Sequence, residues 1–277
     1  MVVTKSPARS TGVAPGPVRG VLLVAEHYWI WYRKNWRATV VSSVLQPLLF
    51  LLAFGVGFGS LVDRTGSAAA ATGGVSYLVW LAPALLAVSA VQSSVSESTY
   101  PVLSGFKWQR VFHAMTAGPI SPGQVALGHL LWVTVKITGA GAVYIAVIAC
   151  FGGVASVGIL VSLLAAVLAG AAVASLVTAF SATLQNEGAA FNTLFRLVLI
   201  PMTLFSGTFF PIDRLPTWVQ PLAWVSPLWH GTDLARAAAL GDMPQPLAVL
   251  GHAVYLMALL VLGIVLAVRQ FTRRLQS

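Results

Sequence analysis

The sequence predicts an all-α integral membrane protein with six transmembrane helices. Of its 277 residues, 57% are apolar and only 8% are charged, and the mean hydropathy is +0.84. A soluble domain usually carries about 25% charged residues, so this composition is typical of a chain solvated mostly by lipid. The net charge of +9 does not indicate nucleic acid as a partner, because the basic residues lie at the edges of six long apolar runs.

Each of the six runs is long enough to cross the hydrocarbon core, which takes about 20 mostly apolar residues. We expect spans at about 40–61, 75–96, 125–150, 154–182, 190–210 and 247–268. All six belong to one transmembrane domain, residues 18–277. The preceding residues, 1–17, are polar and rich in Pro, Gly and Ser, which predicts a disordered tail rather than a cleavable signal.

The basic residues predict the orientation of the spans, because cytoplasmic loops carry an excess of Lys and Arg. An even number of spans places both termini on one side of the membrane. The basic residues expected on that side are Lys5, Arg9, Arg19, Arg33, Lys34, Arg37, Lys107, Arg110, Arg269, Arg273 and Arg274. The opposite side holds only Arg64, Arg214 and Arg236. We therefore expect both termini, including the tail at 1–17, to be cytoplasmic.

Three segments outside the spans have patterns of their own. Residues 18–36 interleave aromatic and charged residues, which is typical of a helix lying in the cytoplasmic interface. The loop at 100–122 is too long for a tight turn, and Ser121 with Pro122 predicts the N-cap and first residue of the third span. Six prolines cut the segment 211–246 into short apolar pieces, which predicts an outer re-entrant hairpin packed against protein.

The sequence argues against chemistry carried out by this chain. No lysine follows a glycine, so no phosphate-binding loop is expected. The histidines lack metal-ligand spacing, Cys150 is the single cysteine, and the acidic residues are scattered. A membrane hydrolase needs a concentrated polar site. We expect no catalytic residue, no metal and no cofactor bound by this chain.

Two motifs resemble a known family. One is FHAMTAGPISP at 112–122, and the other is PMTLFSGTFFP at 201–211. Both are similar to the type-2 permeases of ATP-binding-cassette (ABC) transporters, in the branch that contains nodulation lipo-oligosaccharide and anthracycline exporters. The similarity covers nearly the whole chain from residue 18. It implies a permease of the bacterial inner membrane that pairs with a second permease, the same or a homologous chain, and moves an amphiphilic drug, lipid or lipid-linked saccharide outward.

The resemblance also implies an energy source outside this chain. Two separate ATPase subunits bind ATP and Mg²⁺ beneath such permeases, and the loop between spans two and three carries a coupling helix that docks on an ATPase. The residues that match this helix are Phe106, Lys107, Trp108, Arg110, Val111, Phe112, His113 and Met115. Aromatic anchors beside cations suit a docking surface. The alternative is that Phe106, Trp108 and Phe112 only anchor the loop to lipid headgroups.

Polar residues within the spans are candidates for the substrate path. Lys136, near the middle of span three, either contacts a polar substrate head or is a structural lysine bonded to carbonyl groups or to Glu97. On span five, Asn192, Arg196 and Thr203 follow helical spacing and form a polar stripe, and the resemblance implies that this span lines the permease interface. Arg196 alternatively reaches the inner-leaflet headgroups.

At the outer hairpin, Asp233 and Arg236 are three residues apart and are expected to pair along one helix face as an outer gate. His230 fits a hydrogen-bonded interface residue better than a metal ligand. An ion-coupled secondary transporter is the competing function, but it usually needs an acidic or histidine relay at mid-membrane or inverted repeats, and neither is visible. A lipid-modifying membrane enzyme is disfavoured by the missing polar cluster.

Overall fold

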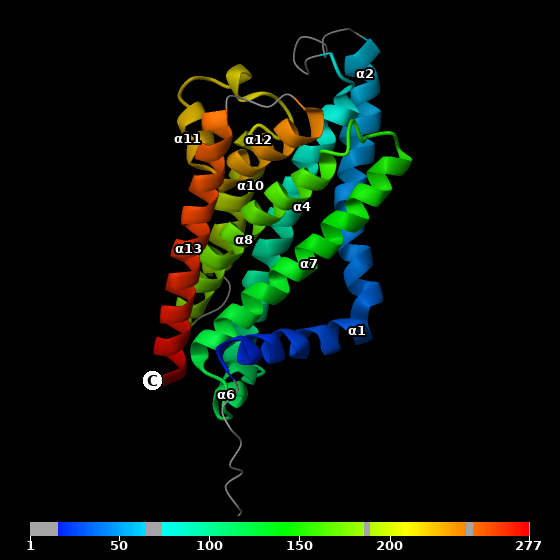
Figure 1. Ribbon diagram of the computed structural model, residues 1–277. Coiled ribbons are helices and arrows are strands. Elements are labelled where there is room, and N and C mark those ends of the chain that lie inside the picture. The colour runs from blue at the N-terminus through cyan, green and yellow to red at the C-terminus, as the bar shows by residue number, and fades with distance from the viewer. Residues whose placement is uncertain (1–15, 65–73, 186–188, 242–245, 277) are drawn as a thin grey trace, which may run out of the picture.

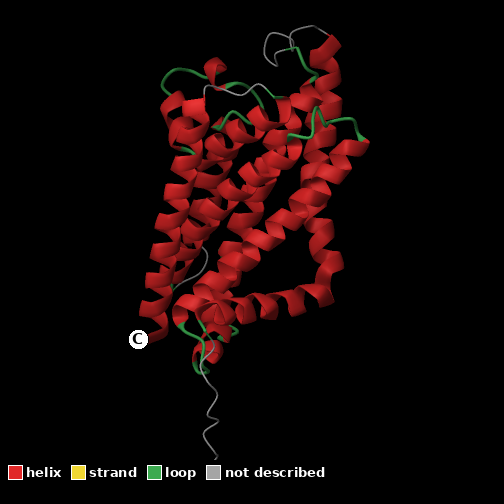
Figure 2. Cartoon of the chain, in the orientation of Figure 1, coloured by secondary structure: helices red, strands yellow, loops and turns green. Residues whose placement is uncertain are grey.

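The computed structural model describes residues 16–64, 74–185, 189–241 and 246–276. Every regular element in these ranges is a helix (Figure 2), which confirms the all-α fold class. The long helices are α1 (Pro17–Phe50), α4 (Tyr77–Ser98), α7 (Pro122–Cys150), α8 (Ile159–Thr183) and α13 (Pro246–Gln276). The short ones are η1 (Leu51–Phe58), α2 (Gly59–Arg64), α5 (Tyr100–Lys107), α6 (Val111–Thr116), α9 (Ala189–Thr193), η2 (Leu194–Leu199), α10 (Ile200–Phe205), η3 (Ile212–Arg214), α11 (Gln220–Val225) and α12 (Pro227–Leu240).

Among the described residues, four helical stretches are long and apolar enough to cross a membrane: 77–107, 122–150, 159–183 and 246–276. Two shorter apolar helices, 51–61 and 189–205, lie where the first and fifth spans were expected. The chain is therefore a multi-pass helical membrane protein, and the count of six spans stays a prediction. The predicted tail at 1–17 lies outside the described residues, except for its last two.

Helix α1 changes direction once. Asn35 has φ −116° and ψ 15°, outside the helical region, and its Nδ2 donates a hydrogen bond to the carbonyl oxygen of Trp31 (3.1 Å). Figure 1 shows the part before this kink running across one end of the bundle and the part after it running along the other long helices. The kink falls at the end of the expected interfacial helix, 18–36.

Helix α7 begins at Pro122 with Ser121 as its N-cap, as the sequence predicts. The Ser121 Oγ accepts from the amide of Gln124 (3.3 Å), and the Gln124 Oε1 accepts from the amide of Ser121 (2.8 Å), which forms a capping box. Gln124 also donates from Nε2 to the carbonyl oxygens of Gly16 and Pro17 (3.4 and 3.3 Å). Gln124, the second member of this capping box, thus also attaches the start of α1 to α7.

Helix α8 is the centre of the bundle and packs against α4, α12 and α13. Small residues on α8, among them Ala169 and Gly170, are buried. Small side chains let helix backbones approach closely. A methyl group on Gly231 of α12 would lie 2.5 Å from the Cβ of Ala169, and Ser162 donates a hydrogen bond to the carbonyl oxygen of Ala235 (2.5 Å). Helix α12 is therefore held against the core rather than free at the surface.

Gly128 sets the distance between α7 and α1. A methyl group at Gly128 would lie 2.5 Å from the Cβ of Val24 and 2.8 Å from the carbonyl oxygen of Val21. Both distances are shorter than non-bonded carbon and oxygen atoms allow, and Val24 is fully buried. A side chain at position 128 therefore pushes α1 away from α7.

We expect Gly128→Ala to lower the free energy of unfolding by about 1–3 kcal/mol, the usual effect of overpacking. Gly139 of the same helix is a matched control, because no atom lies within 4 Å of the position of its added methyl group. Gly139→Ala is expected to be neutral or to stabilise by about 0.5–1 kcal/mol through helix propensity. Thermal unfolding of both variants in detergent, followed by tryptophan fluorescence, measures the difference. Equal midpoints would contradict the packing described for Gly128.

Candidate functional site

The loop between α4 and α7 forms α5 and α6, joined by a turn at residues 108–110. The amides of Trp108 and Gln109 both donate to the carbonyl oxygen of Ser104 (3.1 and 2.9 Å). Arg110 has φ 52° and ψ 26°, the only positive φ among the described non-glycine residues. This left-handed conformation is uncommon for a residue with a side chain. It reverses the chain sharply, and residues 107–110 are all exposed at the turn.

The residues that match the family's coupling helix fall into two groups. The exposed or partly exposed ones are Lys107, Trp108, Arg110, Val111, His113 and Met115. Phe106 and Phe112 are only 3% and 1% exposed. These two rings lie inside the protein, so they cannot be direct anchors for an ATPase or for headgroups. The expectation that they form the docking surface is corrected, because composition does not distinguish the buried face of a short amphipathic helix from its exposed face.

The two buried rings join the turn to the last helix. Phe106, Phe112 and Phe271 of α13 form a cluster with ring centroids 4.8–5.3 Å apart. The guanidinium carbon of Arg274 lies 4.2 Å from the centre of the Phe106 ring, and its Nη1 donates to the carbonyl oxygen of Ala182 at the end of α8 (3.0 Å). Aromatic pairs and cation–π contacts each contribute about 0.5–1.5 kcal/mol. The turn is therefore packed against the ends of α8 and α13.

Lys136 forms an ion pair with Glu97, with 2.6 Å between Nζ and Oε1. The two side chains are 12% and 25% exposed. Glu97 lies one residue before the end of α4, so the pair joins the middle of α7 to the part of α4 that leads into α5. This contact is one of the structural roles that the sequence left open for Lys136. A substrate contact by Lys136 stays a prediction.

The fifth predicted span contains a π-helical turn, η2, which splits the expected polar stripe. Asn192 and Arg196 are exposed on the single chain, whereas Thr203 is buried and donates to the carbonyl oxygen of Leu199 (2.8 Å). A π-helix contains more residues per turn than an α-helix. Residues before and after η2 therefore do not keep a common face, and the expected alignment of the three polar residues is corrected. Their part in a substrate path stays a prediction.

Arg236 joins three elements at the opposite end of the bundle from α6, where α11 and α12 lie (Figure 1). From α12 it donates from Nε to the carbonyl oxygen of Trp80 on α4 (3.3 Å). Its Nη2 donates to the carbonyl oxygens of Gly207 and Thr208 (3.1 and 3.2 Å). The guanidinium carbon lies 3.6 Å from the centre of the Trp80 ring. Burial lowers the pKa of Arg236, which Asp233 partly offsets, and an arginine still stays charged.

The expected pairing of Asp233 with Arg236 is replaced by other contacts. The Oδ2 of Asp233 lies 3.3 Å from the Nε2 of His252 in α13. The Nδ1 atoms of His252 and His230 are 2.7 Å apart, and the Nε2 of His230 donates to the carbonyl oxygen of Trp224 (2.9 Å). Burial lowers the pKa of His230, which favours its neutral form. The Arg236 guanidinium donates to carbonyl groups on other elements. Asp233 contacts His252 and so connects α12 with α13.

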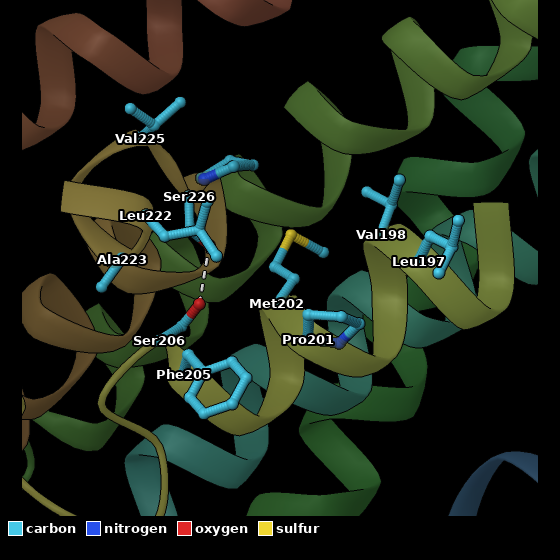
Figure 3. A pocket seen from close by; sticks show the side chains of 11 residues that line it. Leu197, Val198, Pro201, Met202, Phe205, Ser206, Leu222, Ala223, Val225 and Ser226 are labelled. Atoms are coloured by element: carbon cyan, nitrogen blue, oxygen red, sulfur yellow. Dashed lines mark hydrogen bonds between the residues drawn. The ribbon is translucent and has the colours of Figure 1, made fainter. Parts of the chain in front are cut away.

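A mostly apolar pocket of about 240 Å³ lies between α10 and α11 (Figure 3). Met202 and Phe205 line it from α10, and Leu222 lines it from α11. The hydroxyl groups of Ser206 and Ser226 form a hydrogen bond at one side of the pocket, with 2.6 Å between the oxygen atoms. Apolar walls of this kind suit a hydrocarbon segment better than a charged group.

Sequence reasoning missed the residues behind these sites. Trp80 is 156 positions from Arg236, and in the sequence it is only one apolar residue of a span. From the sequence, Phe271 is only a residue near the end of the last helix, and Arg274 is only one of the basic residues expected on the cytoplasmic side. No local periodicity connects such distant segments. The one available signal is that an aromatic or cationic residue at a helix end often packs against a neighbouring element.

The fold defines a class, the multi-pass helical membrane proteins. The pattern of the ABC-2 type transporter family matches residues 20–240, and the chain belongs to this family. It is therefore a permease subunit of an ABC transporter.

Individual relatives agree with the family. The chain is 31% identical over 242 residues to nodulation protein J of Rhizobium leguminosarum bv. viciae, covering 86% of this chain and 88% of the relative. It is 31% identical over 224 residues to nodulation protein J of Rhizobium meliloti (strain 1021), covering 77% of this chain and 82% of the relative. A shorter match, 32% over 62 residues, is to the "Probable multidrug ABC transporter permease YbhR" of Escherichia coli (strain K12), covering 22% of this chain and 17% of the relative.

Proposed function

We propose that this chain is the membrane subunit of an ATP-driven exporter for an amphiphile, which is a drug, a lipid or a lipid-linked saccharide. Two separate ATPase subunits supply the energy and hold ATP and Mg²⁺, and a second permease, the same or a homologous chain, completes the pathway. The chain crosses the bacterial inner membrane six times, with both termini in the cytoplasm. Residues 211–246 form the outer hairpin.

The turn at 108–110 is the observation that carries this proposal. It presents the exposed ring of Trp108 between two cations, Lys107 and Arg110, as a docking surface needs. Directly behind it, Phe106 and Phe112 pack on Phe271. A partner that pushes on the turn would therefore move the ends of α8 and α13 together. Direct contact of Phe106 and Phe112 with an ATPase is not part of the proposal.

The distribution of charge supports the orientation. The turn and the C-terminal end of α13 lie at the same end of the bundle (Figure 1), where most of the basic residues gather. Placing the turn in the cytoplasm, within reach of an ATPase, thus also places the C-terminus there, as the positive-inside rule requires. The hairpin anchored by Arg236 is then on the outer side.

Exposed polar residues on the fifth span support a second permease. Asn192 and Arg196 are exposed on the single chain beside large apolar side chains such as Leu197, which is 71% exposed. A polar group that faces lipid within the membrane is costly. A second permease covering this face would remove that cost and would place both polar side chains at the interface between the two subunits.

A photo-crosslinking amino acid at position 108 tests the docking surface. In native membranes it should capture a protein with ATP-binding-cassette motifs, identified by mass spectrometry. Trp218 is the matched control, because it is 81% exposed and lies between η3 and α11 at the other end of the bundle. Capture of the ATPase from both positions, or from neither, would overturn the proposal.

A further inference from the structure

A continuous chain of polar contacts joins α11, α12 and the start of α13 (Figure 1), and the proposed function gives it no role. His230 of α12 lies at its centre. The Nε2 of His230 is 2.9 Å from the carbonyl oxygen of Trp224 in α11, and its Nδ1 is 2.7 Å from the Nδ1 of His252 in α13. The Nε2 of His252 lies 3.3 Å from the Oδ2 of Asp233, back on α12. Two imidazole rings therefore connect three helices.

The number of protons on these two rings decides how many of the contacts are hydrogen bonds. A carbonyl oxygen and a carboxylate only accept, so each end of the chain of contacts needs an N–H group from an imidazole. The central contact joins two nitrogen atoms and needs one further N–H group. Three N–H groups are thus required, whereas two neutral imidazoles carry only two. One additional proton on the pair completes all three hydrogen bonds.

The surroundings favour His252 as the ring that carries the additional proton. Burial lowers the pKa of His230, which therefore stays neutral and accepts at Nδ1. A proton on His252 faces the carboxylate of Asp233, and the contact between them becomes a charge-assisted hydrogen bond. The side chain of His252 is 11% exposed and that of Asp233 is 38% exposed. The carboxylate thus connects the buried ring with the solvent.

The other charged and titratable groups around the pair have partners of their own or are exposed. Arg236 interacts electrostatically with Asp233, but its guanidinium donates to carbonyl groups on other elements. Tyr77 of α4 donates its hydroxyl to a backbone carbonyl oxygen of the segment after α10 (2.8 Å). The helix η3, which packs against α11, carries Asp213 and Arg214, and both are exposed. The described ranges of α8 and α11 contain no titratable residue, and α6 and α7 contact α13 at residues 271 and 268, near its opposite end.

Tyr255 of α13 completes the connection to α11. Its ring stacks on His230 with 4.0 Å between the centroids, and its hydroxyl donates to the carbonyl oxygen of Val225 (2.6 Å). Two consecutive carbonyl groups of α11, those of Trp224 and Val225, are therefore bound by this one stack of rings. Leu222 and Val225 also line the apolar pocket between α10 and α11. The position of the α11 wall of that pocket thus depends on His230.

We propose that His230 and His252 form a proton-binding site, and that the bound proton fastens α11 and α12 to α13. Three hydrogen bonds join the helices in the protonated state. Above the pH range in which a histidine is ordinarily protonated, one of the three contacts loses its donor. The stabilisation is therefore present at low pH and decreases as the pH rises. Only the side of the membrane on which the site lies rests on the proposed function, and the binding of the proton does not.

Thermal unfolding of the full chain in detergent, at about pH 6 and about pH 8.5, tests the site. Between these pH values the unfolding midpoint of the parent chain should fall by about 3–6 °C more than that of His252→Gln, which keeps a donor and an acceptor but cannot be protonated. Asp233→Asn should resemble His252→Gln, because an amide carries no charge to hold the imidazolium, and its partly exposed position favours a folded variant. His27→Gln is the matched control, because His27 is exposed on α1, and it should keep the pH dependence of the parent.

Hydrogen–deuterium exchange of residues 220–225 locates the effect in α11. After division by the rate of an unstructured peptide of the same sequence, exchange should rise about tenfold from the lower to the higher pH in the parent chain. In His252→Gln it should change by less than about twofold. Equal pH dependence of the parent and Asp233→Asn in both measurements, or a parent that is more stable at the higher pH, would overturn the proposal.

The two proposals fail in different ways. Neither measurement involves an ATPase, so a pH dependence that is the same in all variants leaves the docking surface at Trp108 intact. If position 108 never reaches an ATPase but the variants behave as described, the transport mechanism is wrong and the proton-binding site stands.

Discussion

Replacing Arg236 by methionine is expected to lower the free energy of unfolding by about 3 kcal/mol or more and to abolish transport. The substitution keeps the apolar stem but leaves the carbonyl oxygens of Trp80, Gly207 and Thr208 without the donor they have in the structure. A buried polar group that loses its partner costs about 1–3 kcal/mol. Thermal or denaturant unfolding in detergent measures the loss.

Arg214 provides the matched control, because it lies in η3 at the same end of the bundle and its side chain is exposed. Arg214→Met should change stability by less than about 0.5 kcal/mol. Arg236→Lys should fall between the two, because one ammonium keeps the charge but cannot reach three carbonyls while stacking on Trp80. A stable Arg236→Met variant would show that the hairpin is held by other contacts.

Replacing Trp108 by alanine is expected to abolish ATP-dependent export without changing the unfolding midpoint. The ring is half exposed at the tip of the turn, so its loss leaves no cavity in the protein. Under the proposed function it removes the central anchor of the docking surface, and such anchors contribute about 2 kcal/mol or more to binding. Export is measured as resistance of the host cell to toxic amphiphiles, together with retention of the ATPase during purification.

Phe112→Ala is the informative partner of this variant. Phe112 is fully buried, so its truncation should lower the free energy of unfolding by about 3–5 kcal/mol. Both variants should lose export, but only Phe112→Ala should lose stability. If Trp108→Ala exports normally, the docking assignment fails. If Phe112→Ala is as stable as the parent chain, the packing behind the turn is wrong.

Much of the fold follows from the sequence because lipid imposes strict rules on it. The lengths of the apolar runs predict the long helices, and the start of α7 at Pro122 follows from Ser121 and its capping box. The kink at Asn35 falls within one residue of the end predicted for the interfacial helix, 18–36. The segment predicted as the fifth span is less regular than expected, because hydropathy does not reveal a π-helical turn such as η2.

The sites are less predictable for a related reason. The sequence predicts functional roles for Lys136, Arg236 and Phe112. It leaves the partner of Lys136 open, and it predicts the wrong partner for Arg236 and the wrong exposure for Phe112. Lys136 forms an ion pair with Glu97 on a different helix. Arg236 donates hydrogen bonds to backbone carbonyl groups instead of pairing with Asp233. Spacing along one helix predicts neighbours on that helix only, whereas a buried charge takes whichever donor or acceptor the tertiary packing brings to it.

The sequence alone determined that this chain is a multi-pass helical membrane protein of the ABC-2 type, because composition, run length and motif order are local properties. Only the tertiary structure decided which face of the loop between α4 and α7 is exposed. It placed Trp108 outside and Phe106 and Phe112 inside, against Phe271 of the last helix. The physical reason is that burial depends on contacts between segments far apart in the chain. The pattern of apolar residues within either segment does not reveal which distant segment it contacts.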